Sequence, residues 1–382
     1  MKGSVAHFRS DFSRASERFV TAPLVHLRSW RPVIIGWRVP SAGSAVSSMR
    51  RIAYEDLNVN GLLSRLRWRW GYHPPVAIAQ ARREGIRICH AHFGEDGALA
   101  LPLARKLGVP LVVSFYGHDL TRLPTWRTRR VAWLHYWLRF SALRDRTAVA
   151  LAYCRFLADR LVTLGWPETR VLVHYPGVVL PDIPRWQPDS RLIISIGRLV
   201  EKKGFDTLIE AAAVLRGQGL EFQIIILGDG PLLHSLRSLA QRRGVSDAVR
   251  FAGWVTESEL PDWYARAALL VAASQRARDG DMEGMPTALV EAAAHGIPLV
   301  GTRHAGIPEV VRDGETGIVV PERDPSALAA GIRRMLENPE LRARFAANAR
   351  RLVAAEFSLQ GRVAALESVY DELAAGPLAT GR

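Results

Sequence analysis

Residues 191–216 read RLIISIGRLVEKKGFDTLIEAAAVLR and predict a strand, a loop and a helix in that order. The apolar run at 192–196 is typical of a buried strand, and 206–216 carries apolar residues at helical spacing. A cationic loop lies between them, bounded by Gly197 and Gly204. A strand that leads through a glycine-bounded loop into a helix is the repeating unit of parallel α/β proteins.

The loop itself predicts an anion site. Arg198 and Lys203 lie five residues apart, and we expect both cations to converge on one anion beside the start of the helix. The chain has four lysines against 47 arginines, and Lys202 and Lys203 are adjacent here. A site that needs a compact ammonium group explains this placement better than chance. A diphosphate suits the arrangement, although this segment alone is also compatible with a solvated basic loop.

The alternation of apolar runs and amphipathic stretches continues along the chain and predicts two Rossmann-like α/β domains facing a cleft. Four prolines within 176–188 suit a semi-rigid linker. We therefore assign residues 1–185 to the first domain, 186–356 to the second, and 357–382 to a last helix and tail. The expected strands are 4–8, 33–37, 87–91, 111–115, 148–152, 171–173, 192–196, 222–227, 249–251, 269–272, 299–301 and 318–320. The expected helices include 96–106, 129–141, 206–216, 232–242, 287–295 and 326–336. The last of these belongs to a longer helical stretch at 322–353, which carries Arg on its exposed positions.

Length and composition exclude several protein classes. A chain of 382 residues with 48% apolar and 23% charged residues is neither globally disordered nor small enough for one core. Its apolar runs fall short of the roughly 18 residues that span a bilayer. Charge interrupts the N-terminal segment early, so we expect no signal peptide. The two cysteines, Cys89 and Cys154, provide neither a disulfide framework nor a metal cluster, which favours a cytoplasmic protein.

Basic charge is concentrated in the first half of the chain. Residues 1–189 carry 28 Lys and Arg against 13 Asp and Glu, whereas residues 190–382 carry 23 against 24. Nine of the eleven tryptophans also precede residue 190. Basic residues mixed with indoles indicate an anionic partner surface, either lipid headgroups or nucleic acid. A genome that favours Arg explains the abundance of arginine but not its restriction to one half.

Two segments, 62–73 and 126–140, combine arginines with aromatic residues. As a helix, the second would align five side chains in one stripe: Trp126, Arg130, Trp133, Trp137 and Phe140. Such a stripe is more often part of a core. The flanking arginines raise the alternative of an interfacial helix on an anionic membrane surface.

The second motif, DGDMEGMPTALVEAAAHGIPLV at 279–300, contains Glu283 and Glu291 with seven residues between them. Pro286 suits the first helical position, so Glu283 precedes the helix and Glu291 lies in its second turn. At about 1.5 Å of rise per residue, the carboxylates are on the order of 8–12 Å apart. A retaining glycosidase needs about 5–5.5 Å. We therefore expect the two glutamates to bind different parts of one elongated ligand.

The start of that helix adds anion-binding capacity through the N–H groups around Gly284, Met285 and Thr287. Asp279 and Asp281 imitate a metal-binding D-x-D pair. Two acids are common in a glycine-rich loop, and the basic loop can neutralise a diphosphate without a cation. We expect no bound metal and no other cofactor.

Taken together, the motifs resemble those of family 4 retaining glycosyltransferases, which have the GT-B fold. GRLVEKKG at 197–204, ILGDGP at 226–231, the E-x7-E pair and TRHAGIPEVV at 302–311 follow one another in the family's order. HAHFGEDGALALPLARKLGVPLVVSFYGHDLT at 90–121 and GDMEGMPTALVEA look like the colanic acid and amylovoran branch of exopolysaccharide biosynthesis. The resemblance covers residues 86–375 and implies that the last helix crosses back to the first domain.

The resemblance implies a role for each matching residue. Arg198 and Lys203 would bind the donor diphosphate, Glu283 would lie near the transferred sugar, and Glu291 would hold the ribose hydroxyls. The region of Gly253 and Trp254 would lie near the base. Further donor contacts would come from Gly197, Gly228, Gly230, Gly284, Met285 and Pro286.

The family histidine that contacts the donor sugar falls at Tyr116 in this sequence, and a histidine follows two places later at His118. Either Tyr116 or His118 takes that catalytic position.

The resemblance implies transfer of a hexose from a UDP- or GDP-sugar to a polyprenyl-linked glycan precursor, at the inner face of the plasma membrane. A front-face mechanism is expected, because no nucleophile is evident within reach of the sugar. The alternatives are a nucleotide-sugar epimerase or a phosphorylase of the same fold. The second needs a lysine-bound pyridoxal cofactor and is disfavoured because lysine is so scarce, with Lys106 as the residue formally left for that role. A nucleic-acid-binding protein is disfavoured, because it leaves the motifs of the second half unexplained.

Overall fold

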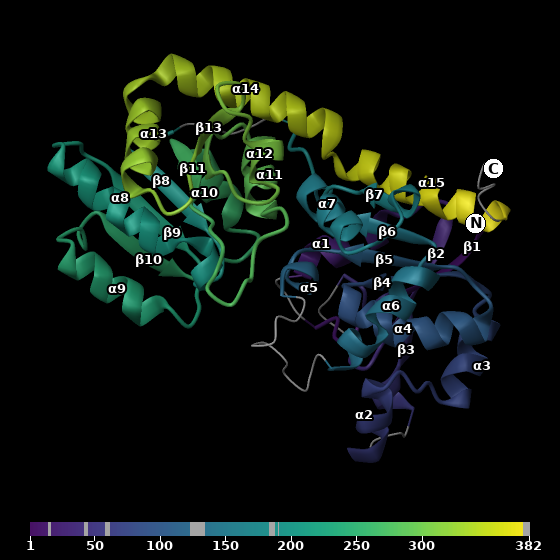
Figure 1. Ribbon diagram of the computed structural model, residues 1–382. Coiled ribbons are helices and arrows are strands. Elements are labelled where there is room, and N and C mark those ends of the chain that lie inside the picture. The colour runs from purple at the N-terminus through teal and green to yellow at the C-terminus, as the bar shows by residue number, and fades with distance from the viewer. Residues whose placement is uncertain are drawn as a thin grey trace. The chain divides into compact units, whose positions relative to one another are not determined.

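The computed structural model of the protein describes residues 1–13, 17–41, 45–57, 62–122, 134–182, 188–189 and 191–376. The chain divides into two compact units (Figure 1). Unit 1 comprises Met1–Gly177 and Leu359–Arg382, and unit 2 comprises Val178–Ser358. The change of unit thus falls at Gly177, where the sequence analysis places it after residue 185. Residues 183–187 of the expected linker lie outside the described ranges.

Unit 1 contains a seven-stranded parallel sheet of order β3-β2-β1-β4-β5-β6-β7. Its strands are β1 (Gly3–Phe8), β2 (Trp30–Gly36), β3 (Arg50–Ala53), β4 (Ile86–His92), β5 (Leu111–Phe115), β6 (Val149–Ala152) and β7 (Val171–Val173). Six of them confirm the predicted strands. The prediction missed β3, because only the last two of its four residues are buried and it has too few apolar positions to show a period.

The helices of unit 1 are α1 (Arg18–Thr21), α2 (Leu62–Arg69), α3 (Pro75–Arg83), α4 (Gly94–Leu107), α5 (His118–Thr121), α6 (Leu134–Arg146), α7 (Arg155–Thr163) and α15 (Leu359–Ala375). The last helix packs on this unit although it follows unit 2 in the sequence, as the yellow ribbon of Figure 1 shows. Leu366 and Tyr370 of α15 join the apolar core formed by Val5, Trp30 and Ile88. The expected return of this helix to the first domain is confirmed.

Unit 2 contains a six-stranded parallel sheet of order β10-β9-β8-β11-β12-β13. Its strands are β8 (Leu192–Ile196), β9 (Gln223–Leu227), β10 (Val249–Gly253), β11 (Leu269–Ala272), β12 (Leu299–Thr302) and β13 (Gly317–Val320). Its helices are α8 (Phe205–Gly217), α9 (Leu233–Arg242), α10 (Leu260–Arg266), α11 (Thr287–Ala294), α12 (Ile307–Val310), α13 (Pro325–Glu337) and α14 (Pro339–Glu356). The order places β8, the strand before the cationic loop, at the centre, which is where ligands of such sheets bind.

Three local expectations in unit 2 are corrected by the structure. The helical stretch predicted at 322–353 is two helices, because the Asn338 side chain accepts a hydrogen bond from the N–H of Leu341 and starts α14. Arg342 is buried instead of exposed, and its guanidinium donates to the carbonyl of Met335. Pro286 precedes the first helical residue of α11 rather than occupying it, with an extended backbone.

The expected aromatic stripe is described only in part, since Trp126, Arg130 and Trp133 lie outside the described residues. Trp137 on α6 is 44% exposed, so this residue does not belong to the core as expected. Phe140 is half-buried and packs edge-on against Trp166. Within the described ranges, every helix falls short of the length and apolar character that a membrane span requires.

Candidate active site

The cationic loop leaves the carboxyl end of β8 and closes tightly on itself. The backbone of Gly197 has φ of 154°, and a Cβ there would lie 2.8 Å from Cε of Lys203. Residues Glu201–Lys203 form a short 3-10 turn, and Gly204 then starts α8 in a left-handed conformation. Glycine at 197 and 204 therefore lets the Lys203 side chain fold back over the end of the strand.

This folding brings Lys203 to Glu283. The Nζ atom of Lys203 lies 3.3 Å from Oε1 of Glu283, and Nζ of Lys202 lies 3.8 Å from the same oxygen. Burial disfavours the charged carboxylate, but the positive charges of Lys202 and Lys203 outweigh it and hold the pKa of Glu283 to about 2. Glu283 is therefore an anion at any physiological pH, fixed beside an ammonium group.

Arg198 takes a different position from Lys203. Its side chain is exposed, and the guanidinium has no hydrogen-bond or ion-pair partner among the residues that the structure describes. The expected pair of converging cations is thus one largely covered lysine, already paired with Glu283, and one arginine open to solvent. A guanidinium in that state is available to a ligand phosphate.

The second glutamate of the pair lies on α11, where Oε2 of Glu291 accepts a hydrogen bond from the Tyr264 hydroxyl at 3.1 Å. Burial, followed by the negative charge of Glu291, raises the pKa of Tyr264 well above its usual range, so that hydroxyl remains a donor. Tyr264 is not among the predicted site residues, because its helix α10 carries no motif. One oxygen of Glu291 is thereby held in place.

The GDGP segment follows β9 and runs close to the cationic loop. The N–H of Gly228 donates to the carbonyl of Gly253, and the N–H of Leu199 donates to the carbonyl of Asp229. Gly230 lies so near the backbone of Leu199 that a Cβ would approach its nitrogen to 2.7 Å. Trp254, next along from β10, is 62% exposed. Two predicted segments therefore meet at one edge of the sheet.

The turn that follows β12 is hydrogen-bonded to the residues just before α11. The N–H of Gly306 donates to the carbonyl of Gly284 at 2.9 Å, and the N–H of Glu283 donates to Nε2 of His304 at 3.1 Å. Met285 is 4% exposed and Pro286 is buried beside it. His304 was not among the predicted site residues, although it lies in the quoted TRHAGIPEVV motif.

The acidic D-x-D segment is tied to the loop. Oδ1 of Asp281 lies 3.3 Å from Nζ of Lys202, and Oδ1 of Asp279 accepts the N–H of Asp281. Lys202 therefore already provides a positive charge to one of the two carboxylates that a metal ion would need.

In unit 1, Tyr116 and His118 follow β5 at the carboxyl ends of the strands, where parallel sheets bind ligands. The Tyr116 hydroxyl is hydrogen-bonded to Nδ1 of His92 at 2.8 Å. His118 Nε2 lies 3.2 Å from Oε1 of Glu95, and 29% of the His118 side chain is exposed. The Asp119 carboxylate accepts the N–H of Gly117 at 2.8 Å, which fixes the turn carrying both candidates.

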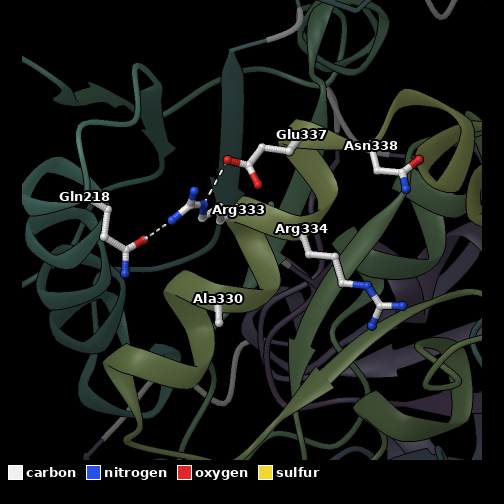
Figure 2. Close-up of a pocket in the computed structure, with 6 residues that line it drawn as sticks. All are labelled: Gln218, Ala330, Arg333, Arg334, Glu337 and Asn338. Carbon is white, nitrogen blue, oxygen red and sulfur yellow. Dashed lines mark hydrogen bonds and ion pairs between the residues drawn. The ribbon is translucent and has the colours of Figure 1, made fainter.

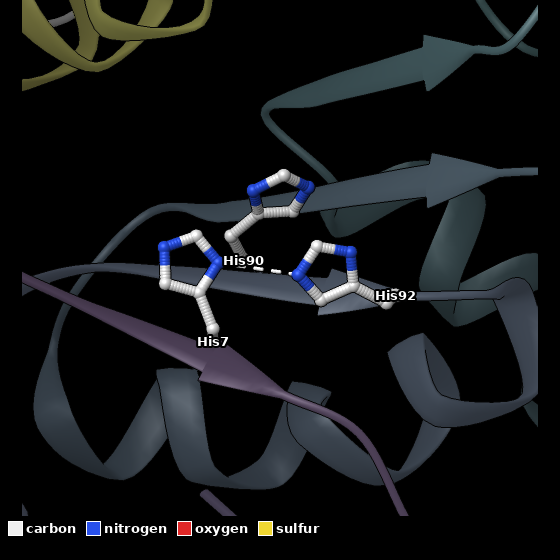
Figure 3. A group of neighbouring side chains, drawn as sticks. All are labelled: His7, His90 and His92. Atoms are coloured by element: carbon white, nitrogen blue, oxygen red, sulfur yellow. Dashed lines mark hydrogen bonds between the residues drawn. The ribbon is translucent and has the colours of Figure 1, made fainter. Parts of the chain in front are cut away.

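Three buried histidines form a further cluster in unit 1, drawn in Figure 3. His7 Nδ1 lies 3.1 Å from His92 Nε2, while the two nitrogens of His90 lie 2.6 Å from the Tyr370 hydroxyl and 2.8 Å from the Ser114 hydroxyl. Burial lowers the pKa of His7 to about 3 and those of His90 and His92 well below their usual range. All three imidazoles are therefore neutral.

Among the described residues, these three are the group of ligand-type side chains that could hold a metal ion, with one nitrogen from each within 4.8 Å of the others. Hydrogen bonds already engage both nitrogens of His90 and of His92, so we assign the cluster to the polar core of unit 1. The signal in the sequence is the H-x-H spacing on β4, which puts both side chains on one face of the strand.

A cavity of about 440 Å³ opens on unit 2 at α13 and the end of α8 (Figure 2). Of the described residues, it is lined by Gln218, Ala330, Arg333, Arg334, Glu337 and Asn338. The Arg333 guanidinium donates to Glu337 at 2.8 Å. The predicted site residues lie elsewhere, so this cavity is separate from the candidate site.

The chain has two parallel α/β units, and the cationic loop after β8 in one of them lies against Glu283. Comparisons with known proteins identify the family. A family model described as Glycosyl transferases group 1 matches residues 180–352, and one described as Glycosyltransferase Family 4 matches residues 38–182. The α-D-kanosaminyltransferase of Streptomyces kanamyceticus is 32% identical over 76% of this chain and 79% of its own. The chain therefore belongs to the family 4 glycosyltransferases.

Relatives from exopolysaccharide biosynthesis are similar at a comparable level. The putative colanic acid biosynthesis glycosyltransferase WcaL of Salmonella typhimurium is 37% identical over 63% of this chain and 59% of its own length. The amylovoran biosynthesis glycosyltransferase AmsK of Erwinia amylovora is 32% identical over 69% of this chain and 64% of its own. The chain thus spans about three fifths of the length of these relatives. The recognised family and branch are confirmed.

Solved structures confirm the GT-B fold. Anabaena HepE, solved in complex with UDP, aligns with a TM-score of 0.75 at 16% identity over 97% of this chain and 100% of its own. Sucrose-phosphate synthase from Thermosynechococcus elongatus aligns with a TM-score of 0.73 at 17% identity over 98% and 99% of the two chains.

Proposed function

We propose that the protein is a retaining glycosyltransferase that moves a hexose from a UDP- or GDP-sugar to a polyprenyl-linked exopolysaccharide precursor. The observation that carries this proposal is the ion pair between Lys203 and the buried Glu283, on a loop that also carries the exposed Arg198 guanidinium. Fixed cations at the end of a parallel strand suit a diphosphate, and an ionised carboxylate beside them suits the hydroxyls of a sugar.

The chemistry follows from where charge develops. Cleavage of the sugar–phosphate bond builds negative charge on the departing diphosphate, and Lys203 and Arg198 would stabilise it there. In the front-face mechanism that we propose, the departing phosphate takes the proton of the incoming acceptor hydroxyl. Isolation of a covalent glycosyl–enzyme adduct would contradict this mechanism.

In unit 1 we propose His118, rather than Tyr116, as the side chain that contacts the donor sugar. His92 already engages the Tyr116 hydroxyl, and burial raises the pKa of Tyr116 above its usual range. His118 is 29% exposed, so a ligand can reach its ring, and Glu95 holds Nε2 of that ring at 3.2 Å.

The donor is tested by a panel of UDP-, GDP- and ADP-sugars, scored by calorimetric binding and by slow donor hydrolysis. We expect one clear responder and an affinity about tenfold lower for Glu291→Ala, because the lost carboxylate leaves two ribose hydroxyls unbound. Glu340→Ala, an exposed glutamate of α14, is the matched control and should bind as the wild type does. Equal binding by both variants would contradict the ribose assignment.

The same panel tests two further parts of the proposal. Metal-independent action predicts unchanged donor hydrolysis in the presence of EDTA, because Lys202 already pairs with Asp281. An epimerase, the alternative of the same fold, would change the sugar without releasing a nucleoside diphosphate. Loss of hydrolysis in EDTA, or an isomerised donor as the sole product, would overturn the corresponding statement.

We further propose that unit 1 binds an anionic membrane surface on the cytoplasmic side, where a polyprenyl-linked acceptor would lie. Trp70 and Tyr72 beyond α2, and Trp137 and Leu138 on α6, are each exposed by 44% or more. The Arg139 guanidinium donates to the carbonyl of Trp70, which ties these two aromatic segments together. Exposed indoles among arginines suit a headgroup layer.

Flotation with phosphatidylglycerol liposomes tests the membrane proposal. We expect the protein to co-float at low salt, and the double variant Trp70→Ala/Trp137→Ala to bind at least about fivefold more weakly, because two interfacial indoles are lost. Trp254→Ala removes a still more exposed tryptophan from unit 2, and this variant should float normally. Failure of the wild type to float, or equal losses in both variants, would contradict this surface.

A further inference from the structure

The turn after β12 contacts the backbone of Glu283, the first glutamate of the E-x7-E pair. Nε2 of His304 lies 3.1 Å from the backbone nitrogen of Glu283, and Nδ1 of His304 lies 2.6 Å from Oε1 of Glu322. His304 is fully buried, and 26% of the Glu322 side chain is exposed. The three groups form one chain from a carboxylate, through an imidazole, to the Glu283 amide.

These contacts determine the protonation of His304. A backbone N–H can only donate, so Nε2 must be the acceptor and must carry no proton. The proton of the neutral ring is therefore on Nδ1, where it is donated to Glu322. The second oxygen of Glu322 accepts the N–H of Arg276 at 2.9 Å, which holds the carboxylate in place.

The same turn holds the next residue as well. The N–H of Gly306 donates to the carbonyl of Gly284 at 2.9 Å, so two successive residues of the Glu283 turn are bound from one side. Ala305 lies between His304 and Gly306, the two residues of this turn that make these hydrogen bonds. Its φ of 44° is unusual for a residue with a side chain. A backbone held in such a conformation is consistent with a turn that is shaped for a function.

We propose that His304 is a positioning residue of the donor site, with its proton on Nδ1. It orients the Glu283 backbone so that the Glu283 carboxylate lies against Lys203. This inference rests on the proposed function. Without the imidazole, the buried N–H of Glu283 would lose its acceptor, and the turn would have to move to find another. The Glu283 carboxylate would then leave the 3.3 Å contact with Lys203.

The first test uses the protein without any ligand. Long-range ¹H–¹⁵N NMR on histidine-labelled protein reads which nitrogen of each imidazole carries the proton, and the signals missing from His304→Gln belong to His304. We expect a protonated Nδ1 and an unprotonated Nε2. A proton on Nε2 would overturn the proposal, because the Glu283 N–H would then have no acceptor.

The second test separates positioning from general support of the fold. We expect His304→Leu to bind the responding nucleotide sugar at least about tenfold more weakly, and His304→Gln to stay within about threefold of the wild type. The glutamine amide can accept at one atom and donate at the other, as the imidazole does. His234→Leu, an exposed histidine of α9, is the matched control.

Equal affinities for the Leu and Gln variants would overturn the positioning role. If the Leu variant does not fold, Glu322→Ala serves instead, with an expected loss of about threefold or more, because Nδ1–H then loses its acceptor. Unchanged binding by that variant would count against the proposal. A wild type that binds no nucleotide sugar would overturn the proposed function, whereas the NMR result would still decide the tautomer of His304.

Discussion

Lys203→Ala is expected to lower the kcat of donor turnover by about 100- to 1,000-fold, the range found when a group that stabilises developing charge is removed. Two effects combine. In the proposed mechanism the departing diphosphate loses one of its two cations, and Glu283 loses the ammonium at 3.3 Å that helps to keep its pKa at about 2. Steady-state donor hydrolysis or transfer measures the loss.

The neighbouring lysine provides the matched control. Lys202 has a similar exposure, but its Nζ contacts Asp281 and the carbonyl of Met282 at 3.3 Å and lies farther from Glu283. We expect Lys202→Ala to cost less than about tenfold, the size of a lost partly exposed ion pair. Activity of Lys203→Ala within about twofold of the wild type would show that the diphosphate binds elsewhere.

Acidification from about pH 7.5 to about pH 5 is expected to destabilise unit 1 strongly. Burial lowers the pKa of His7 to about 3 and that of His73 to about 4, and holds those of His90 and His92 well below their usual range. All four residues belong to unit 1. In the unfolded chain each imidazole has a pKa of about 6.5, so the unfolded state binds more protons below that pH.

Stability that is present above about pH 6.5 is lost as the pH falls toward the folded-state values, by about 2 kcal/mol per histidine at pH 5. Hydrogen exchange, corrected for the intrinsic rate, measures this in peptides from β1 and β4 against peptides from β8 and β11. We expect the first pair to lose protection and the second pair to lose much less.

Single variants check the assignment. His73→Asn removes one titrating group and should reduce the pH slope of unit 1 stability by up to about 1.4 kcal/mol per pH unit. His234→Asn, exposed on α9, should leave the slope unchanged. An identical loss of protection in both units would mean that the buried imidazoles do not control the acid response.

Much of the fold is predictable from local patterns. The strands β5, β7, β8 and β11 have the predicted bounds, because each is an apolar run flanked by turns. Where the pattern was weak, prediction failed: β3 begins with two exposed arginines, and the stretch at 322–353 breaks at Asn338 because its side chain caps a new helix. Both depend on single residues rather than on a period.

The candidate site, like the fold, is predictable only in part. The GRLVEKKG loop and the E-x7-E pair are visible in the sequence, because glycine spacing and the start of a helix are local properties. Which of the two lysines lies closer to Glu283 is not a local property. Lys202 and Lys203 are adjacent in the sequence, yet the closure of the loop at Gly197 and Gly204 turns the second toward Glu283 at 3.3 Å.

The sequence by itself determined the family, the order of the two units and the segments that carry the site. Only the tertiary structure decided the partners of each functional side chain. Three such hydrogen bonds join segments on different strands and helices: His304 with Glu283, Tyr264 with Glu291, and His92 with Tyr116. The physical reason is that burial leaves a periodic trace in the sequence, whereas a contact between distant segments depends on the order in which parallel strands are placed in the sheet.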